Sequence, residues 1–134
     1  MGEVRARVKL TNAVDEALLR RGQLSPDQVR TYEADALVDT GAVRSVLPPH
    51  VVQQLGLALR GQRVADGRKE MVGVTEAIVI AWQGRDTLEE ALVLGDEVIL
   101  GQTVLEKLDV LADCARQQLV PNPAHPDQPV SKVK

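Results

Sequence analysis

The feature that most constrains this chain is the hexapeptide Leu-Val-Asp-Thr-Gly-Ala at positions 37–42. Two apolar residues lead directly into Asp39, Thr40 and Gly41, a pattern that suits a buried strand delivering a carboxylate to a cleft. A hydroxyl can lock the following turn, and a glycine lets backbone approach closely. The tripeptide alone is a weak signal, because roughly one chain in thirty of this length carries it by chance. The alternative is a strand that simply ends in a polar turn, since Asp and Gly are common turn residues.

Three further features accompany this motif. Ser45 follows it closely and precedes two aliphatic residues. A second apolar run, 98–100, ends at Gly101 and is followed by a helical pattern over 103–108. Between them, 62–74 holds an Asp-Gly pair flanked by extended runs, which is a strong hairpin signal.

In this order, the features resemble the retropepsin-like (retroviral-type, clan AA) aspartic protease family. There, Asp-Thr-Gly-Ala precedes Ser or Thr and two aliphatic residues, and a hydrophobic-hydrophobic-Gly strand precedes a single helix. The resemblance covers about 29–120 and favours a bacterial member. It implies an all-β fold, an acid-protease closed β-barrel with a flap hairpin at 62–74 and one or two short helices. We expect a protease domain over 1–120, with 13–29 as an insert without viral counterpart, and a Pro-rich tail, extended or disordered, over 121–134.

Local patterns predict the individual elements. Period-two alternation predicts a strand over 3–10, and Asn12 and Gly22 are the cap and stop of a helix. The other predicted elements are a strand at 31–38, a helix at 51–55 closed by Gly56, hairpin arms at 77–82 and 87–94, and strands at 111–113 and 118–120.

Composition agrees with a small domain and excludes several functions. One Trp, one Tyr and no Phe leave a core of aliphatic residues. The net charge of −3, without a basic patch, argues against nucleic acid as a partner, and no apolar run is long enough to span a membrane. The single cysteine, Cys114, fits a reducing compartment, so we expect a cytoplasmic protein. No His/Cys cluster is present, and we expect neither a metal nor a cofactor.

The count of Asp-Thr-Gly motifs predicts an assembly. Aspartic peptidase chemistry needs two close carboxylates that hold one proton between them. This chain has one such motif, so a second copy must supply the other Asp39 across a twofold axis. The resemblance likewise implies a homodimer acting on a protein or peptide. As in that family, part of the interface is expected to be a sheet of chain termini, with 4–10 and 118–120 as candidates.

The resemblance also assigns the site. Its catalytic residues are Asp39, Thr40 and Gly41, with Thr40 hydrogen-bonding across the interface. Its substrate-binding residues are Gly41, Ala42 and the flap-tip residues Ala65, Asp66 and Gly67. Its supporting residues are Ser45, Leu100 and Gly101, and Ser45 is expected to bond the turn that carries Asp39.

The chain departs from the viral pattern at two linked positions. Viral enzymes carry an acid after Asp-Thr-Gly-Ala and pair it with an arginine after the second glycine, but here these positions are Val43 and Gln102. Arg44 and Gln102 are candidate replacements. The departure keeps open an alternative function, a non-catalytic dimerisation or peptide-binding domain that retains the fold.

Overall fold

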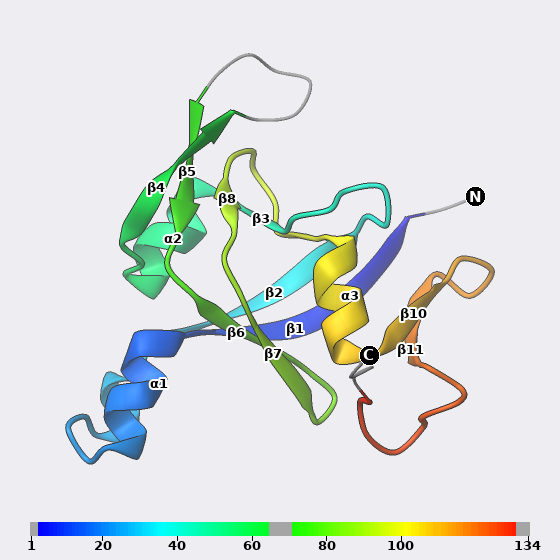
Figure 1. The fold of residues 1–134 in the computed structure, drawn as a ribbon, viewed down its shortest axis with the longest axis horizontal. Coiled ribbons are helices and arrows are strands. Elements are labelled where there is room, and N and C mark those ends of the chain that lie inside the picture. Colours follow the sequence, from blue (N-terminus) through cyan, green and yellow to red (C-terminus); the bar gives the residue numbers. More distant parts are fainter. Residues whose placement is uncertain (1–2, 65–70, 131–134) are drawn as a thin grey trace.

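The first strand, β1 (Val4–Asn12), is an interior strand of the larger of two sheets. A computed structural model describes residues 3–64 and 71–130 of the chain (Figure 1). β1 pairs antiparallel with β2 (Thr31–Val38) along its length and with β6 (Ile78–Trp82) over its second half. Its even-numbered apolar residues are buried, from Val4 to Leu10, which is the alternation that the sequence predicted.

The strands form a nine-stranded sheet and a two-stranded sheet. The order in the larger sheet is β4-β5-β8-β3-β9-β2-β1-β6-β7, and the smaller sheet pairs β10 with β11. The remaining bounds are β3 Val46–Leu47, β4 Leu59–Val64, β5 Met71–Thr75, β7 Arg85–Glu89, β8 Leu92–Val93, β9 Ile99–Leu100, β10 Val110–Asp113 and β11 Gln118–Pro121. The larger sheet curls into half of a barrel (Figure 1), so the predicted all-β class is confirmed.

Two parallel pairings at the middle of the sheet position the site. β9 pairs in parallel with β2 and antiparallel with β3, and β3 in turn pairs in parallel with β8. The pairing of β2 with β9 joins segments that are far apart in the sequence, with Leu37 opposite Ile99. The end of β2 and the end of β9 therefore lie side by side, with Val38 opposite Leu100.

The described residues contain three short α-helices, and α1 and α2 have end signals that the sequence predicted. α1 (Ala13–Arg20) begins at Asn12, whose side chain accepts a hydrogen bond from the Asp15 N–H. α2 (Pro49–Leu55) starts with a proline and ends at Gly56 in the left-handed conformation. α3 (Gln102–Leu108) follows the second glycine motif. A single 3-10 turn, η1 (Pro26–Gln28), completes the segment after α1.

The core is aliphatic, as the composition requires. The largest fully buried side chains include Leu10, Leu47, Leu55, Ile80 and Leu100, which come from strands and helices throughout the chain. Trp82 is also buried and packs in this cluster.

The C-terminal segment folds back onto α3. Asp109, directly after that helix, accepts hydrogen bonds from the Asn122 side-chain amide and the Val130 N–H, and its carboxylate lies 2.6 Å from Nδ1 of His125. The buried guanidinium of Arg85 donates to the carbonyls of Asp109 and His125. Up to residue 130, the tail expected to be extended or disordered therefore turns around the end of α3.

One expectation needs correction. The second arm of the 77–94 hairpin ends at Glu89, because Ala91 exchanges hydrogen bonds with Thr75 and the chain passes to β5 and then β3 as β8. The segment 4–10 stays a candidate interface strand, because β2 pairs with it on one side and β6 pairs with β1 only from Lys9 to Asn12.

Candidate active site

The Asp39 turn and the second glycine motif meet where β2 and β9 end. The Asp39 N–H donates to the Leu100 carbonyl at 3.0 Å, which continues the parallel pairing one residue beyond Val38. One step earlier, the Leu37 N–H donates to Val98. The two motifs therefore share one framework of backbone hydrogen bonds.

The Asp39 carboxylate is fixed by its own turn. The Gly41 N–H donates to Oδ1 of Asp39 at 2.9 Å, and the Ala42 N–H donates to the Asp39 carbonyl at 3.1 Å. A Cβ at position 41 would lie 3.2 Å from that carboxylate oxygen, so glycine permits the close approach. Asp39, Thr40 and Gly41 are all exposed. A carboxylate held through one oxygen keeps lone pairs available for a water or for a second carboxyl group.

Gly101 and Ser45 hold the loop that follows this turn. A Cβ at position 101 would lie 2.7 Å from the carbonyl carbon and oxygen of Arg44 and from the oxygen of Val43, so no larger residue fits without moving backbone. The buried hydroxyl of Ser45 accepts from the Gly101 N–H at 3.0 Å. Ser45 therefore bonds the second motif, and the expectation that it bonds the turn carrying Asp39 is wrong.

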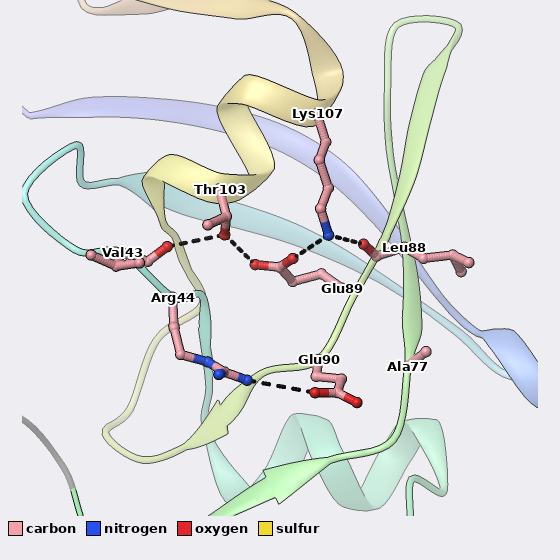
Figure 2. A pocket seen from close by; sticks show the side chains of 8 residues that line it. All are labelled: Val43, Arg44, Ala77, Leu88, Glu89, Glu90, Thr103 and Lys107. Atoms are coloured by element: carbon pink, nitrogen blue, oxygen red, sulfur yellow. Dashed lines mark hydrogen bonds and ion pairs between the residues drawn. The ribbon is translucent and has the colours of Figure 1, made fainter. Parts of the chain in front are cut away.

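The first turn of α3 also contacts this loop. The Gln102 N–H donates to the Ala42 carbonyl at 2.7 Å. The Val43 carbonyl accepts from the Thr103 N–H at 3.3 Å and lies 3.0 Å from the Thr103 hydroxyl oxygen (Figure 2). The N–H groups at the start of a helix have no partner within the helix, so the loop satisfies them.

The candidate replacements for the viral ion pair do not contact each other. The Gln102 side chain donates to Glu106 at 3.3 Å, within α3. Arg44 instead faces Glu90 at 3.7 Å. Val43 has no charge and is 67% exposed.

Three residues that the sequence analysis did not select line a cavity beside the loop. The buried carboxylate of Glu89 lies 2.6 Å from the Thr103 hydroxyl and 2.9 Å from Nζ of Lys107 (Figure 2). Thr103 and Lys107 are four residues apart and therefore share one face of α3. That spacing was the available signal in the sequence, but their partner comes from β7.

The arms of the predicted flap are present. β4 and β5 pair antiparallel from Leu59–Thr75 to Val64–Met71, and this hairpin projects from the body of the fold (Figure 1). Arg60 on β4 pairs with Glu90, which also faces Arg44. The predicted tip residues Ala65, Asp66 and Gly67 lie outside the described residues. Over 3–64 and 71–130, no group of three His, Cys, Asp or Glu side chains is arranged to hold a metal ion.

Comparison with known proteins adds to this geometry. No protein-family model matches the sequence, and no curated protein matches it. Among solved structures, the retroviral protease-like domain of Ddi1 from Leishmania major matches at a TM-score of 0.56 and 17% identity, over 90% of each chain. The EIAV protease in complex with the inhibitor HBY-793 matches at 0.52 and 20%, over 80% of this chain and 88% of the other.

A retropepsin-like aspartic protease from Rickettsia conorii matches at a TM-score of 0.55 and 15% identity, over 84% of this chain and 77% of the other. All three carry the retroviral type of protease domain, and each matches most of the described chain. The fold of this chain is therefore that of the retropepsin-like aspartic proteases.

Proposed function

We propose that the chain is a homodimeric aspartic endopeptidase whose two Asp39 residues, one from each protomer, activate a water for peptide hydrolysis. The main support for this proposal is the Asp39 carboxylate, which is exposed and is held in place by the Gly41 N–H beside the end of β9. This carboxylate is pre-positioned, and it lacks a second carboxylate within its own turn.

The chemistry follows from two carboxyl groups in contact. They share one proton, because two like charges at that distance cannot both be ionised. The ionised carboxylate takes a proton from the water molecule while the water oxygen attacks the scissile carbonyl carbon. The protonated carboxyl group donates a hydrogen bond to the carbonyl oxygen. The carbon–nitrogen bond then breaks as the first carboxyl group passes the proton that it took from water to the leaving amine, which leaves one proton on the pair again.

The other predicted residues have roles around this pair. Thr40 hydrogen-bonds across the twofold axis, and Gly41 and Ala42 present backbone to the peptide. The tip formed by Ala65, Asp66 and Gly67 closes over the substrate, while Ser45, Leu100 and Gly101 keep the Asp39 turn in place. The predicted interface strands are the segment 4–10 of β1 and the segment 118–120 of β11, which lies in the smaller sheet.

Compartment and partners follow from simpler features. No helix in the described ranges has the length and apolar character needed to cross a membrane. Cys114 is an exposed free thiol, which suits a reducing compartment and supports a cytoplasmic peptidase. A protein or peptide is the proposed substrate.

The test is the conservative substitution Asp39→Asn. Cleavage of an unstructured protein such as casein is expected to fall by at least about 10²–10⁴-fold, the range typical for a positioned acid or base. The matched control is Asp86→Asn, which neutralises an exposed carboxylate on β7 and should leave cleavage unchanged. Because removal of two touching acids relieves repulsion, Asp39→Asn dimers should be at least as stable as wild type. Wild-type turnover by Asp39→Asn contradicts the proposal.

The missing charges at Val43 and Gln102 favour one second candidate, a non-catalytic peptide-binding or dimerisation domain. That function predicts no cleavage by the wild-type chain and no effect of Asp39→Asn on dimer formation. A statine-type inhibitor separates the two, because it mimics the tetrahedral transition state and should block cleavage only by an active dyad.

A further inference from the structure

The buried carboxylate of Glu89 forms an unusual chain of contacts beside the Asp39 loop. Only 8% of the residue is exposed, yet it bears a charge whose burial needs compensation. Lys107 supplies that compensation at 2.9 Å and also donates to the Leu88 carbonyl at 2.8 Å (Figure 2). Oε2 of Glu89 faces the Thr103 hydroxyl at 2.6 Å, a length typical of a charge-assisted hydrogen bond.

Thr103 connects this ion pair to the loop. Its hydroxyl oxygen lies between Glu89 and the Val43 carbonyl, at 2.6 and 3.0 Å, and its backbone N–H donates to the same carbonyl. A hydroxyl has one hydrogen for these two acceptors. The hydroxyl therefore shares this hydrogen between the Glu89 carboxylate and the Val43 carbonyl, as a three-centre hydrogen bond, and the Thr103 side chain links the two acceptors.

The position of Val43 makes this contact relevant to Asp39. Val43 is only four residues beyond the carboxylate, and its side chain is exposed, so no core packing holds it. The loop is instead fixed from one side, by the Gln102 N–H at Ala42 and by Thr103 at Val43. Displacement of this loop would be transmitted to the Asp39 turn, because the Ala42 N–H donates to the Asp39 carbonyl.

We propose that Thr103, Glu89 and Lys107 are positioning residues for Asp39, and that they provide the support of the loop that the charges absent from Val43 and Gln102 cannot provide. The inference rests on the proposed peptidase function. It assigns the ion pair between the buried Glu89 and the exposed Lys107 to catalytic geometry. Catalytic geometry is sensitive to small shifts, because a displacement of about 1 Å can lower a rate by about 10²-fold. An ion pair with an exposed partner is otherwise weak support for stability.

The first experiment replaces the hydroxyl. Thr103→Val removes it at nearly constant shape, and kcat should fall about 10–100-fold with little change in KM, since the peptide-binding surface stays in place. Thr103→Ser retains the hydroxyl and should restore most of kcat. Glu89→Gln and Lys107→Met each remove one charge of the ion pair, and each should also lower kcat, as Thr103→Val does.

The matched control is Asp15→Asn in α1. It disrupts another buried carboxylate, which binds Arg30 far along the chain from the loop, and it should lower Tm without changing kcat. Wild-type kcat in Thr103→Val, or an equal loss in Thr103→Ser, overturns the inference.

A second readout separates this inference from the function on which it rests. Amide hydrogen exchange at Gly41 and Ala42 should accelerate at least about tenfold in Thr103→Val, because the loop that supports their N–H hydrogen bonds is no longer held in place. Exchange at these two amides should not accelerate in Thr103→Ser or Asp15→Asn. Faster exchange with no cleavage by wild type keeps the positioning role and rejects the peptidase. Normal cleavage and unchanged exchange in Thr103→Val reject the positioning role and keep the peptidase.

Discussion

At the scale of single residues, Gly101 is a position where the backbone leaves no room for a side chain. A side chain there would meet the backbone of Arg44 and Val43 at 2.7 Å, closer than real Cβ contacts. Backbone cannot rotate away as a flexible side chain can. The backbone of the loop can therefore contact the start of α3 only because residue 101 has no Cβ. The Ser45 hydroxyl adds a hydrogen bond from the Gly101 N–H.

Gly101→Ala tests this close approach. The added methyl must push the 43–44 backbone outward, and overpacking of this kind costs about 1–3 kcal/mol of unfolding free energy. Peptidase activity should fall by more than the loss of folded protein, because the loop leads back to Asp39. Gly61→Ala is the control, since a Cβ there meets nothing within 4 Å. Equal stability and activity for the two variants would show that position 101 has room. Chemical denaturation and initial rates provide both measurements.

The residues of the site were predictable to different extents. Asp39 and Gly101 were predictable because each belongs to a contiguous motif, whose local pattern fixes the turn. Glu89 was not, because it looks like an ordinary acid on a strand and meets Thr103 and Lys107 only after the sheet has folded. The predicted hydrogen-bond partner of Ser45 was wrong for the same reason. Its actual partner, Gly101, is 56 residues away in the sequence and comes close only in the folded chain.

At the scale of elements, the insert after β1 is anchored by polar contacts. Asn12 is buried, caps α1 with its oxygen, and donates through Nδ2 to the Leu55 carbonyl at 2.8 Å, which ties α1 to the end of α2. Asp15 accepts from the Arg30 backbone N–H and from its guanidinium at 2.8 and 3.0 Å. The pair Asp15–Arg30 thus joins α1 to the residue that directly precedes β2 and holds the connecting segment in place.

This anchor predicts a pH dependence of stability. The hydrogen bonds from the Arg30 guanidinium lower the pKa of Asp15 below its ordinary value, against the opposing effect of burial. A lowered folded-state pKa means that the charged form stabilises the fold above the unfolded pKa, and that this stabilisation is lost as pH falls through the folded value. Asp15→Asn should therefore lower the unfolding free energy by about 2 kcal/mol near neutral pH.

The difference between Asp15→Asn and wild type should be constant from about pH 5 to 8 and shrink below about pH 4, where the unfolded aspartate becomes protonated. Urea denaturation at several pH values measures it. Glu16→Gln, on the exposed side of the same helix turn, should show no such trend. A difference that persists unchanged at low pH would mean that packing, and not charge, anchors the segment.

Element prediction was most successful where end signals were strong. The start of α1 at Asn12 and the end of α2 at Gly56 carry specific caps, and both were predicted. The end of β7 was misplaced because nothing local indicates that the Ala91 backbone will pair with Thr75. Pairing partners that are distant in the sequence decide such boundaries.

At the scale of the whole molecule, the proposed function makes each chain the holder of half of a site. The Asp39 carboxylate is exposed, and within 3–64 and 71–130 its turn faces no second Asp-Thr-Gly. β2 pairs with β1 along its length, whereas β6 pairs with it only from Lys9 to Asn12. We expect the proposed dimer to form around the exposed Asp39 turn, with the start of β1 and the smaller β10–β11 sheet, where Leu111 is exposed, as its candidate strands.

Mixing wild-type chains with Asp39→Asn chains tests this assembly directly. If each site needs one carboxylate from each chain, heterodimers will be poor catalysts. With a threefold excess of mutant and random exchange, only about one wild-type chain in four finds a wild-type partner, so activity per wild-type chain should fall to about one quarter. The fall should develop with the rate of subunit exchange, and the same mixture assayed before exchange should retain full activity. If activity per wild-type chain stays constant after exchange is complete, each chain must hold its own complete site, and the shared pair of Asp39 carboxylates is wrong.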